Sequence, residues 1–153
     1  MAVFRVNLYN TFENALKRRA FSAPSKTNRE YNDFSDLSHW SELEKIKKGN
    51  LLLLCRGIYQ IWSIAFATDD CRITNVDAFR EEMRYERNGF RYVNFKVYKE
   101  LVQPIDGKIY FDKLFEKENP FIEPHLCMQL NPITNRLGTF NKAINHLLEI
   151  VQQ

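Results

Sequence analysis

Two groups of basic side chains are the first candidates for chemistry in this 153-residue sequence. The first group contains Lys17, Arg18, Arg19, Lys26 and Arg29. The second group contains Arg84, Arg87 and Arg91, interleaved with Tyr85, Phe90 and Tyr92. Because cationic groups bind phosphate and aromatic rings stack on bases, this mixture suits contact with a nucleic-acid backbone. The alternative for each group is an ordinary solvated helix face, balanced in the second group by Glu81, Glu82 and Glu86.

The overall charge does not make the chain a general binder of polyanions. With 22 Lys and Arg against 19 Asp and Glu, the formal net charge is only +3. A polybasic scaffold that binds through bulk charge carries a much larger excess. Any phosphate binding is therefore expected from local clusters of basic side chains. A few phosphate contacts are enough for moderate affinity.

Residues that could support catalysis or hold a metal are present, but their spacing is wrong. The three histidines, His39, His125 and His146, are far apart, and no two form an H-x-x-x-H pair. No Gly-rich phosphate loop, G-x-S-x-G elbow or C-x-x-C pair occurs. The sequence therefore predicts a module that is not an enzyme and that uses no metal or cofactor.

The three cysteines, Cys55, Cys71 and Cys127, indicate the compartment. They are widely spaced, odd in number and mostly set among apolar residues, which is typical of buried free thiols under reducing conditions. The first ten residues lack the apolar core of a signal peptide, and no apolar run has membrane-spanning length. We therefore expect a cytoplasmic protein without membrane contact.

Residues 40–68 carry the clearest structural signals. Ser41 and Glu44 have the spacing of a capping box, so a short helix is expected to begin here. A lysine-rich last turn and Gly49 are typical of the end of such a helix. Residues 51–54 are four consecutive leucines and predict a strand that is buried on both faces, and a second apolar strand follows.

The rest of the chain predicts a mixed fold. The other expected elements are a strand at 4–8 with one buried face, a helix capped by Asn10 and Glu13, a loop over 22–36, a half-buried strand at 93–97, a short strand at 108–111, a strand at 126–130 and a C-terminal helix that includes 140–151. Short strands with helices at the periphery favour an α+β class, a small curled sheet or β-barrel of about six strands. The length suits a single domain over residues 1–153.

Several short motifs resemble the PUA-like barrels of the EVE and YTH type. These motifs are Ile46–Asn50, Leu51–Leu54, Ile61–Ala67, Val93–Val97, Pro104-Ile105 and Met128–Leu130. The sequence departs from the family pattern where Asn50 replaces an Asp and Ser63 replaces a Gly, and residues 71–89 have no counterpart. Within this class the chain is similar to the N-terminal DNA-recognition domain of McrB-like, modification-dependent restriction systems. That likeness implies a longer protein, with an AAA+ motor in the same chain and a nuclease subunit as partner.

The resemblance implies a non-catalytic module that reads methylated DNA by flipping a base into an aromatic pocket. Trp40, Trp62 and Tyr59 are the candidate walls, and Asn32 and Asp33 are candidates to read the Watson–Crick edge. Stacking on aromatic rings returns the few kcal/mol that a flipped base loses. The two groups of basic residues would then hold the phosphates.

Each candidate also has a structural interpretation. Trp40 can pack on its own helix, and Trp62 can be a core residue on a strand face shared with Ile64 and Phe66. Tyr59 would face the opposite side unless the strand bulges, and Asn32 and Asp33 are common turn residues. Two other functions therefore stay open, a protein-interaction or assembly domain without a nucleic-acid role and an RNA-binding PUA-like module.

Overall fold

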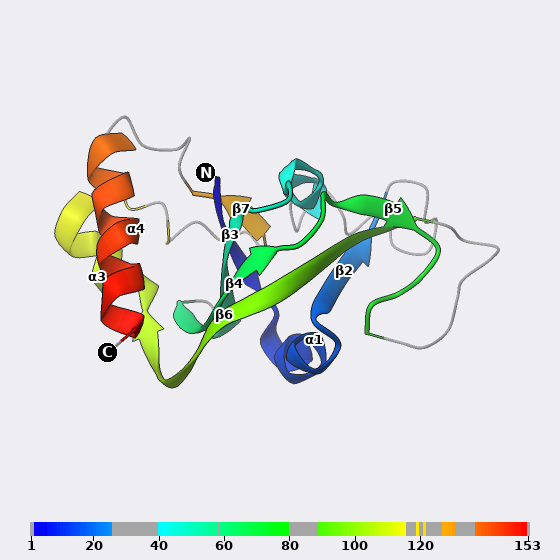
Figure 1. The fold of residues 1–153 in the computed structure, drawn as a ribbon, viewed down its shortest axis with the longest axis horizontal. Helices are drawn as coiled ribbons and strands as arrows, with labels where there is room; N and C mark the ends of the chain where they lie inside the picture. The colour runs from blue at the N-terminus through cyan, green and yellow to red at the C-terminus, as the bar shows by residue number, and fades with distance from the viewer. Residues whose placement is uncertain are drawn as a thin grey trace.

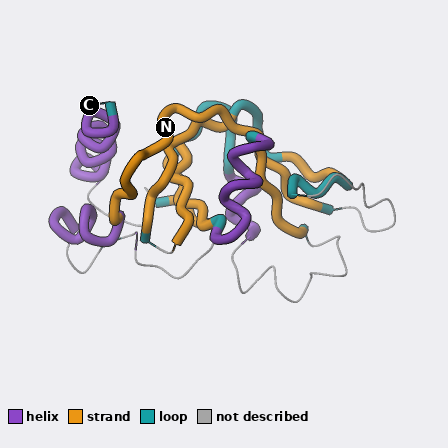
Figure 2. The backbone as a smooth tube through the Cα atoms, turned by 90° about the horizontal axis from the view of Figure 1, so that it is seen from below, coloured by secondary structure: helices purple, strands orange, loops and turns teal. Residues whose placement is uncertain are grey.

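A computed structural model describes residues 2–25, 40–57, 59–79, 89–115, 119, 121, 127–130 and 137–152. Its centre is a curled, seven-stranded sheet (Figures 1 and 2). The strands are β1 (Val3–Asn7), β2 (Ala20–Pro24), β3 (Leu51–Gly57), β4 (Gln60–Ala67), β5 (Arg72–Thr74), β6 (Phe90–Asp106) and β7 (Cys127–Gln129). Their order is β2-β6-β4-β3-β1-β7, and β5 pairs with β6 beside this path. The pairing of β1 with β3 is parallel, and the other pairings are antiparallel.

Helices cover the two ends of this sheet. The described ones are the 3₁₀ helices η1 (Tyr9–Thr11) and η2 (Trp40–Lys45) and the α-helices α1 (Phe12–Arg18), α3 (Gly107–Phe115) and α4 (Leu137–Val151). Figure 1 shows α3 and α4 together at one end of the sheet, well away from α1. Among the described helices, none combines the length and the apolarity that crossing a membrane requires. The expected α+β class with a curled sheet and peripheral helices is confirmed.

The sheet separates two hydrophobic cores. The α4-side core takes Leu51 and Leu53 of β3 and packs them against residues of α3 and α4. The α1-side core takes Leu52 and Leu54 and packs them against residues of α1, β2 and η2. All four leucines are fully buried, as the apolar run predicts, because alternate side chains of a strand point to opposite faces.

The turn before β3 also follows the prediction, but the helix before it is of another type. Gly49 has φ = +87°, and the Lys47 N–H donates to Asn50 Oδ1 at 2.8 Å, which closes the turn. The preceding element is a six-residue 3₁₀ helix that already includes Ser41, so the expected short helix is present but the Ser41–Glu44 capping box does not stand at its start. Burial of Leu43 against the α1-side core holds this short element in place.

Four other elements differ from expectation. β1 is buried on both faces rather than one, because it lies between β3 and β7 with a core on each side. Thr11, not Asn10, precedes α1, and its hydroxyl donates to Leu8 O instead of capping the helix. Residues 22–24 belong to β2, Ser25 follows the strand, and residues 26–36 lie outside the described residues. Residues 108–111 form part of α3 and not a strand.

Candidate functional site

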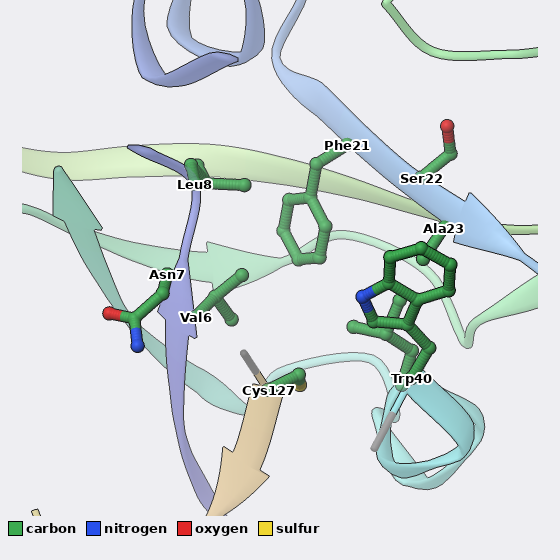
Figure 3. A pocket seen from close by; sticks show the side chains of 9 residues that line it. Val6, Asn7, Leu8, Phe21, Ser22, Ala23, Trp40 and Cys127 are labelled. Carbon is green, nitrogen blue, oxygen red and sulfur yellow. The ribbon is translucent and has the colours of Figure 1, made fainter. Parts of the chain in front are cut away.

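A hollow opens on the α1 side of the sheet, where β2 and β1 face each other across η2 and the start of β7 (Figure 3). Its empty volume is about 270 Å³. The lining residues are Val6, Asn7, Leu8, Phe21, Ser22, Ala23, Trp40, Leu43 and Cys127. This lining is mainly apolar with a few polar groups, which is the usual composition of a small-ligand site.

Two aromatic rings stand in the wall of the hollow. Phe21 comes from β2 and is almost fully buried, so its ring is fixed by packing. Trp40 is the first residue of η2 and is only partly buried, so part of the indole stays accessible. Figure 3 shows the indole nitrogen directed toward the interior of the hollow. A planar ligand in the hollow would therefore meet an aromatic surface and an N–H donor.

The backbone of Ser22 supplies a hydrogen-bond donor and an acceptor beside the hollow. Arg19 O accepts a hydrogen bond from Phe95 N–H at 3.0 Å, and Ser25 N–H donates to Gly89 O. The odd-numbered residues between 19 and 25 therefore direct their backbone hydrogen bonds toward β6. Because neighbouring residues of a strand direct their backbone groups to opposite edges, the N–H and C=O of Ser22 point away from β6. Within the described part of the chain, β2 pairs with β6 alone. The hollow therefore adjoins a strand edge that no other described strand pairs with.

The side chain of Ser22 fixes a second segment to this edge. Its hydroxyl accepts a hydrogen bond from Ala78 N–H at 2.9 Å and donates to Asp77 Oδ1 at 3.3 Å. Asp77 Oδ1 also accepts from Phe79 N–H at 2.9 Å. These bonds hold residues 77–79 against β2 and leave the Ser22 backbone in a fixed position.

The thiol in the hollow is not a nucleophile. Cys127 is buried, and burial raises the pKa of its thiol well above the ordinary value. The neutral form is therefore the one present near neutral pH, whereas nucleophilic attack needs the thiolate. Nor do the described residues include three or more His, Cys, Asp or Glu arranged to hold a metal ion.

Of the three predicted pocket aromatics, the structure places Trp40 in the lining of the hollow but not Trp62 or Tyr59. Trp62 packs on the α1-side core and its Nε1–H donates to Gln60 Oε1 at 3.4 Å. The expectation that it shares a strand face with Ile64 and Phe66 is wrong, because both of those pack on the α4-side core. The pairing of β4 with β6 shifts register between Ile61 and Ser63, which reverses the alternation there.

Tyr59 lies on the other side of the sheet from Trp40. It packs against the α4-side core, and Lys108 Nζ lies 5.6 Å from the centre of its ring. The predicted edge-reading residues Asn32 and Asp33 lie outside the described residues. The predicted walls therefore do not meet in one cage in the described part of the structure.

The predicted phosphate-binding residues fall into three sets. Lys17, Arg18 and Arg19 are exposed at the end of α1. Lys26, Arg29, Arg84 and Arg87 lie outside the described residues. The prediction for Arg91 does not fit its position, because the side chain is 1% exposed. It donates to Pro24 O and lies 3.5 Å from Glu44 Oε1, so it links β6 to β2 and η2.

Sequence reasoning missed Phe21, Ser22 and Asn7. The stretch around Phe21 and Ser22 contains Ser and Pro and looks like a loop in the sequence, whereas pairing with β6 makes it a strand. Asn7 ends β1, lines the hollow and is 8% exposed. A polar residue directly after Val6, at the end of a strand that also contains Val3 and Phe4, is the one signal that could have indicated it.

The fold, but not the sequence, is similar to known proteins. No protein-family model and no curated protein matches the chain. The YTH domain of Pho92, solved in complex with m6A, matches with a TM-score of 0.54 and 10% identity over 99% of this chain and 86% of that one. The YTH domain of Mmi1 matches with a TM-score of 0.52 and 12% identity over 99% and 75%, respectively.

A second Mmi1 structure, described as a complex with RNA, matches with a TM-score of 0.50 and 14% identity over 97% of this chain and 86% of that one. At these identities the likeness concerns the fold alone. It confirms the YTH part of the expected resemblance, whereas the further likeness to McrB-like modules stays a prediction. The chain thus has the fold of YTH domains.

Proposed function

We propose that this chain is a non-catalytic module that binds RNA and holds one methylated base in the hollow beside Trp40. The hollow itself carries this proposal, because it combines an accessible indole, an apolar lining and a strand edge that no other described strand pairs with. Two proteins of the same fold, the YTH domains of Pho92 and Mmi1, were solved with m6A and with RNA. These structures support RNA, which the sequence leaves open as an alternative, over methylated DNA.

The lining of the hollow suits a methylated base. Stacking on an aromatic ring stabilises a bound base by about 1–3 kcal/mol. The side chains of Val6, Leu8 and Leu43 offer apolar surface to a methyl group, each buried Å² being worth about 25 cal/mol.

The Ser22 edge explains how the base would be read. Adenine offers an N6–H donor next to a ring-nitrogen acceptor. The C=O of Ser22 can accept the N6–H, and its N–H can donate to the ring nitrogen. A single methyl on N6 leaves one N6–H for this bond, whereas two methyl groups remove it.

Binding of matched oligonucleotides tests the proposal. Three RNAs of one sequence would carry adenine, N6-methyladenine or N6,N6-dimethyladenine at one central position, and a DNA strand would carry N6-methyladenine there. We expect the singly methylated RNA to bind most tightly and the dimethylated RNA at least tenfold more weakly, since the lost hydrogen bond leaves a buried carbonyl unpaired. Affinity can be measured by fluorescence anisotropy.

The other outcomes have definite meanings. Equal affinity for all three RNAs would show that the hollow does not read the base. Tighter binding of the methylated DNA would restore the modification-dependent restriction module as the function, with its motor and nuclease partners. Absence of binding to every oligonucleotide would favour a protein-interaction domain.

A further inference from the structure

One face of β6 is open to solvent from Tyr92 to Lys96. Arg91, Val93 and Phe95 are buried, as expected for alternate residues that face the α1-side core. Tyr92 and Asn94, between them, are only partly buried, and Lys96 is exposed. Residues two apart on a strand are separated by about 7 Å, so Tyr92 and Lys96 are about 13 Å apart along this face.

Arg72 of β5 lies over one end of this row. It is the cross-strand partner of Tyr92, and its guanidinium carbon lies 4.9 Å from the centre of the Tyr92 ring. The side chain is nevertheless exposed. A guanidinium held on a ring loses less freedom when it binds a phosphate, and its N–H groups match the phosphate oxygens.

Arg19 lies at the other end of the row. Phe95 N–H donates to Arg19 O at 3.0 Å, so the backbone of this exposed arginine lies next to the residue that precedes Lys96. Among the described residues, two carboxylates flank the row. Asp69 does so because the neighbouring Thr68 N–H donates to Asn94 O, and Asp77 does so because its Oδ1 accepts a hydrogen bond from the hydroxyl of Ser22, the cross-strand partner of Tyr92. The three cations outnumber these two acids.

The row begins next to the hollow. Ser22, which lines the hollow, is the cross-strand partner of Tyr92. The row lies on the opposite face of the sheet from the hollow. Paired strands are about 4.8 Å apart, so an RNA strand with one base in the hollow reaches this face by crossing the edge of β2. We infer that Arg19, Lys96, Asn94, Tyr92 and Arg72 form a stripe that binds the phosphates next to the base held in the hollow. This inference rests on the proposed function.

The dependence of affinity on salt tests the stripe. In the stripe variant, Arg72→Gln and Lys96→Gln remove two cations and Arg19→Asn removes the third, Asn being chosen because residue 19 has φ = +55°. Each lost phosphate contact on a single strand lowers the slope of log K against log salt by about 0.7, so we expect a loss of about 2. Affinity for methylated and unmethylated RNA should fall by the same factor.

A second triple variant gives the matched control. Lys108→Gln, Lys113→Gln and Lys142→Gln remove three exposed cations from α3 and α4, and Lys108 also lies over a tyrosine ring. This control variant should keep the wild-type slope. An unchanged slope in the stripe variant, or an equal loss in the control variant, would overturn the stripe.

The same measurements separate the stripe from the proposed function. Wild-type protein that binds methylated and unmethylated RNA equally, with a slope that falls only in the stripe variant, would overturn base reading and support the stripe. A clear preference of the wild-type protein for methylated RNA, with no change of slope in the stripe variant, would support base reading and overturn the stripe. Wild-type protein that binds neither RNA would overturn both.

Discussion

The two faces of the sheet are built from the same strands but are closed to different degrees. On the α4 side, Phe111 stacks on Phe121 at 5.5 Å and on Phe140 at 5.9 Å, and all three rings are fully buried. On the α1 side, Phe21 and Trp40 leave an open hollow between them. The difference indicates that one core supplies rigidity and that the other keeps its aromatic surface available to a ligand.

Removing a ring from the closed side should have the largest effect. Phe121→Ala is expected to lower the free energy of unfolding by about 3–5 kcal/mol, because it leaves a cavity beneath Phe111 and takes the ring from Arg5, whose guanidinium lies 5.4 Å from its centre. Urea denaturation measures this. Ile109→Ala on α3 is the control, since that side chain is 57% exposed and should cost under about 0.5 kcal/mol. A loss of less than 1 kcal/mol in the Phe121 variant would mean that this side is not the rigid one.

Removing a ring from the open side should act on binding more than on stability. Trp40→Ala is expected to weaken binding of methylated RNA by about 10- to 100-fold, since one base–aromatic stack is worth about 1–3 kcal/mol. Trp62→Ala is a matched control, because this tryptophan packs on the same core, is also partly buried and does not line the hollow. Equal losses of affinity in the two variants would show that lining the hollow gives Trp40 no special role in binding.

A smaller effect is expected on the pH dependence of stability, through the buried thiols on the two faces of the sheet. Cys55 belongs to the α4-side core, and burial raises the pKa of its thiol to about 12. Cys127 belongs to the α1-side core, and its thiol pKa is raised by the same cause. The unfolded chain loses these thiol protons at a lower pH than the folded protein does. The free energy of unfolding is therefore undiminished below about pH 9 and falls as the pH rises toward the thiol pKa values of the folded protein.

Each thiol contributes up to about 1.4 kcal/mol per pH unit to this fall. Cys55→Ala and Cys127→Ala should each make the decline above pH 9 shallower when unfolding is followed in urea. The two variants are compared with wild-type protein at pH 7, where the thiols are protonated in both states. An unchanged decline in both variants would contradict the assigned pKa directions.

Features set by neighbouring residues and features set by distant ones were not equally predictable from the sequence. Leu51–Leu54 and Gly49 are determined by local rules of burial and turn geometry, and the structure has both where the sequence places them. β2 depends on pairing with β6, which lies far along the chain, so its Ser- and Pro-containing stretch resembles a loop until the partner is known. The bulge that turns Trp62 to the α1 side is likewise set between strands and has no local signature.

The buried arginines show the same limit. A lone Arg in a sequence is assigned to the surface by default, because burial of an unpaired charge is costly. Arg91 escapes that cost through Pro24 O and Glu44, which come from two other elements. Such partners become visible only once the chain is folded.

The position of β1 between β3 and β7 has a consequence for the order in which the sheet can be assembled. Its two partners are β3, which begins at Leu51, and β7, which begins at Cys127. During synthesis β1 leaves the ribosome before either partner, and one of its edges cannot be covered by β7 until the chain has grown past residue 129. Contacts of such long sequence separation form slowly. Until then the nascent chain carries an exposed strand edge, a state in which chaperone binding would guard against aggregation.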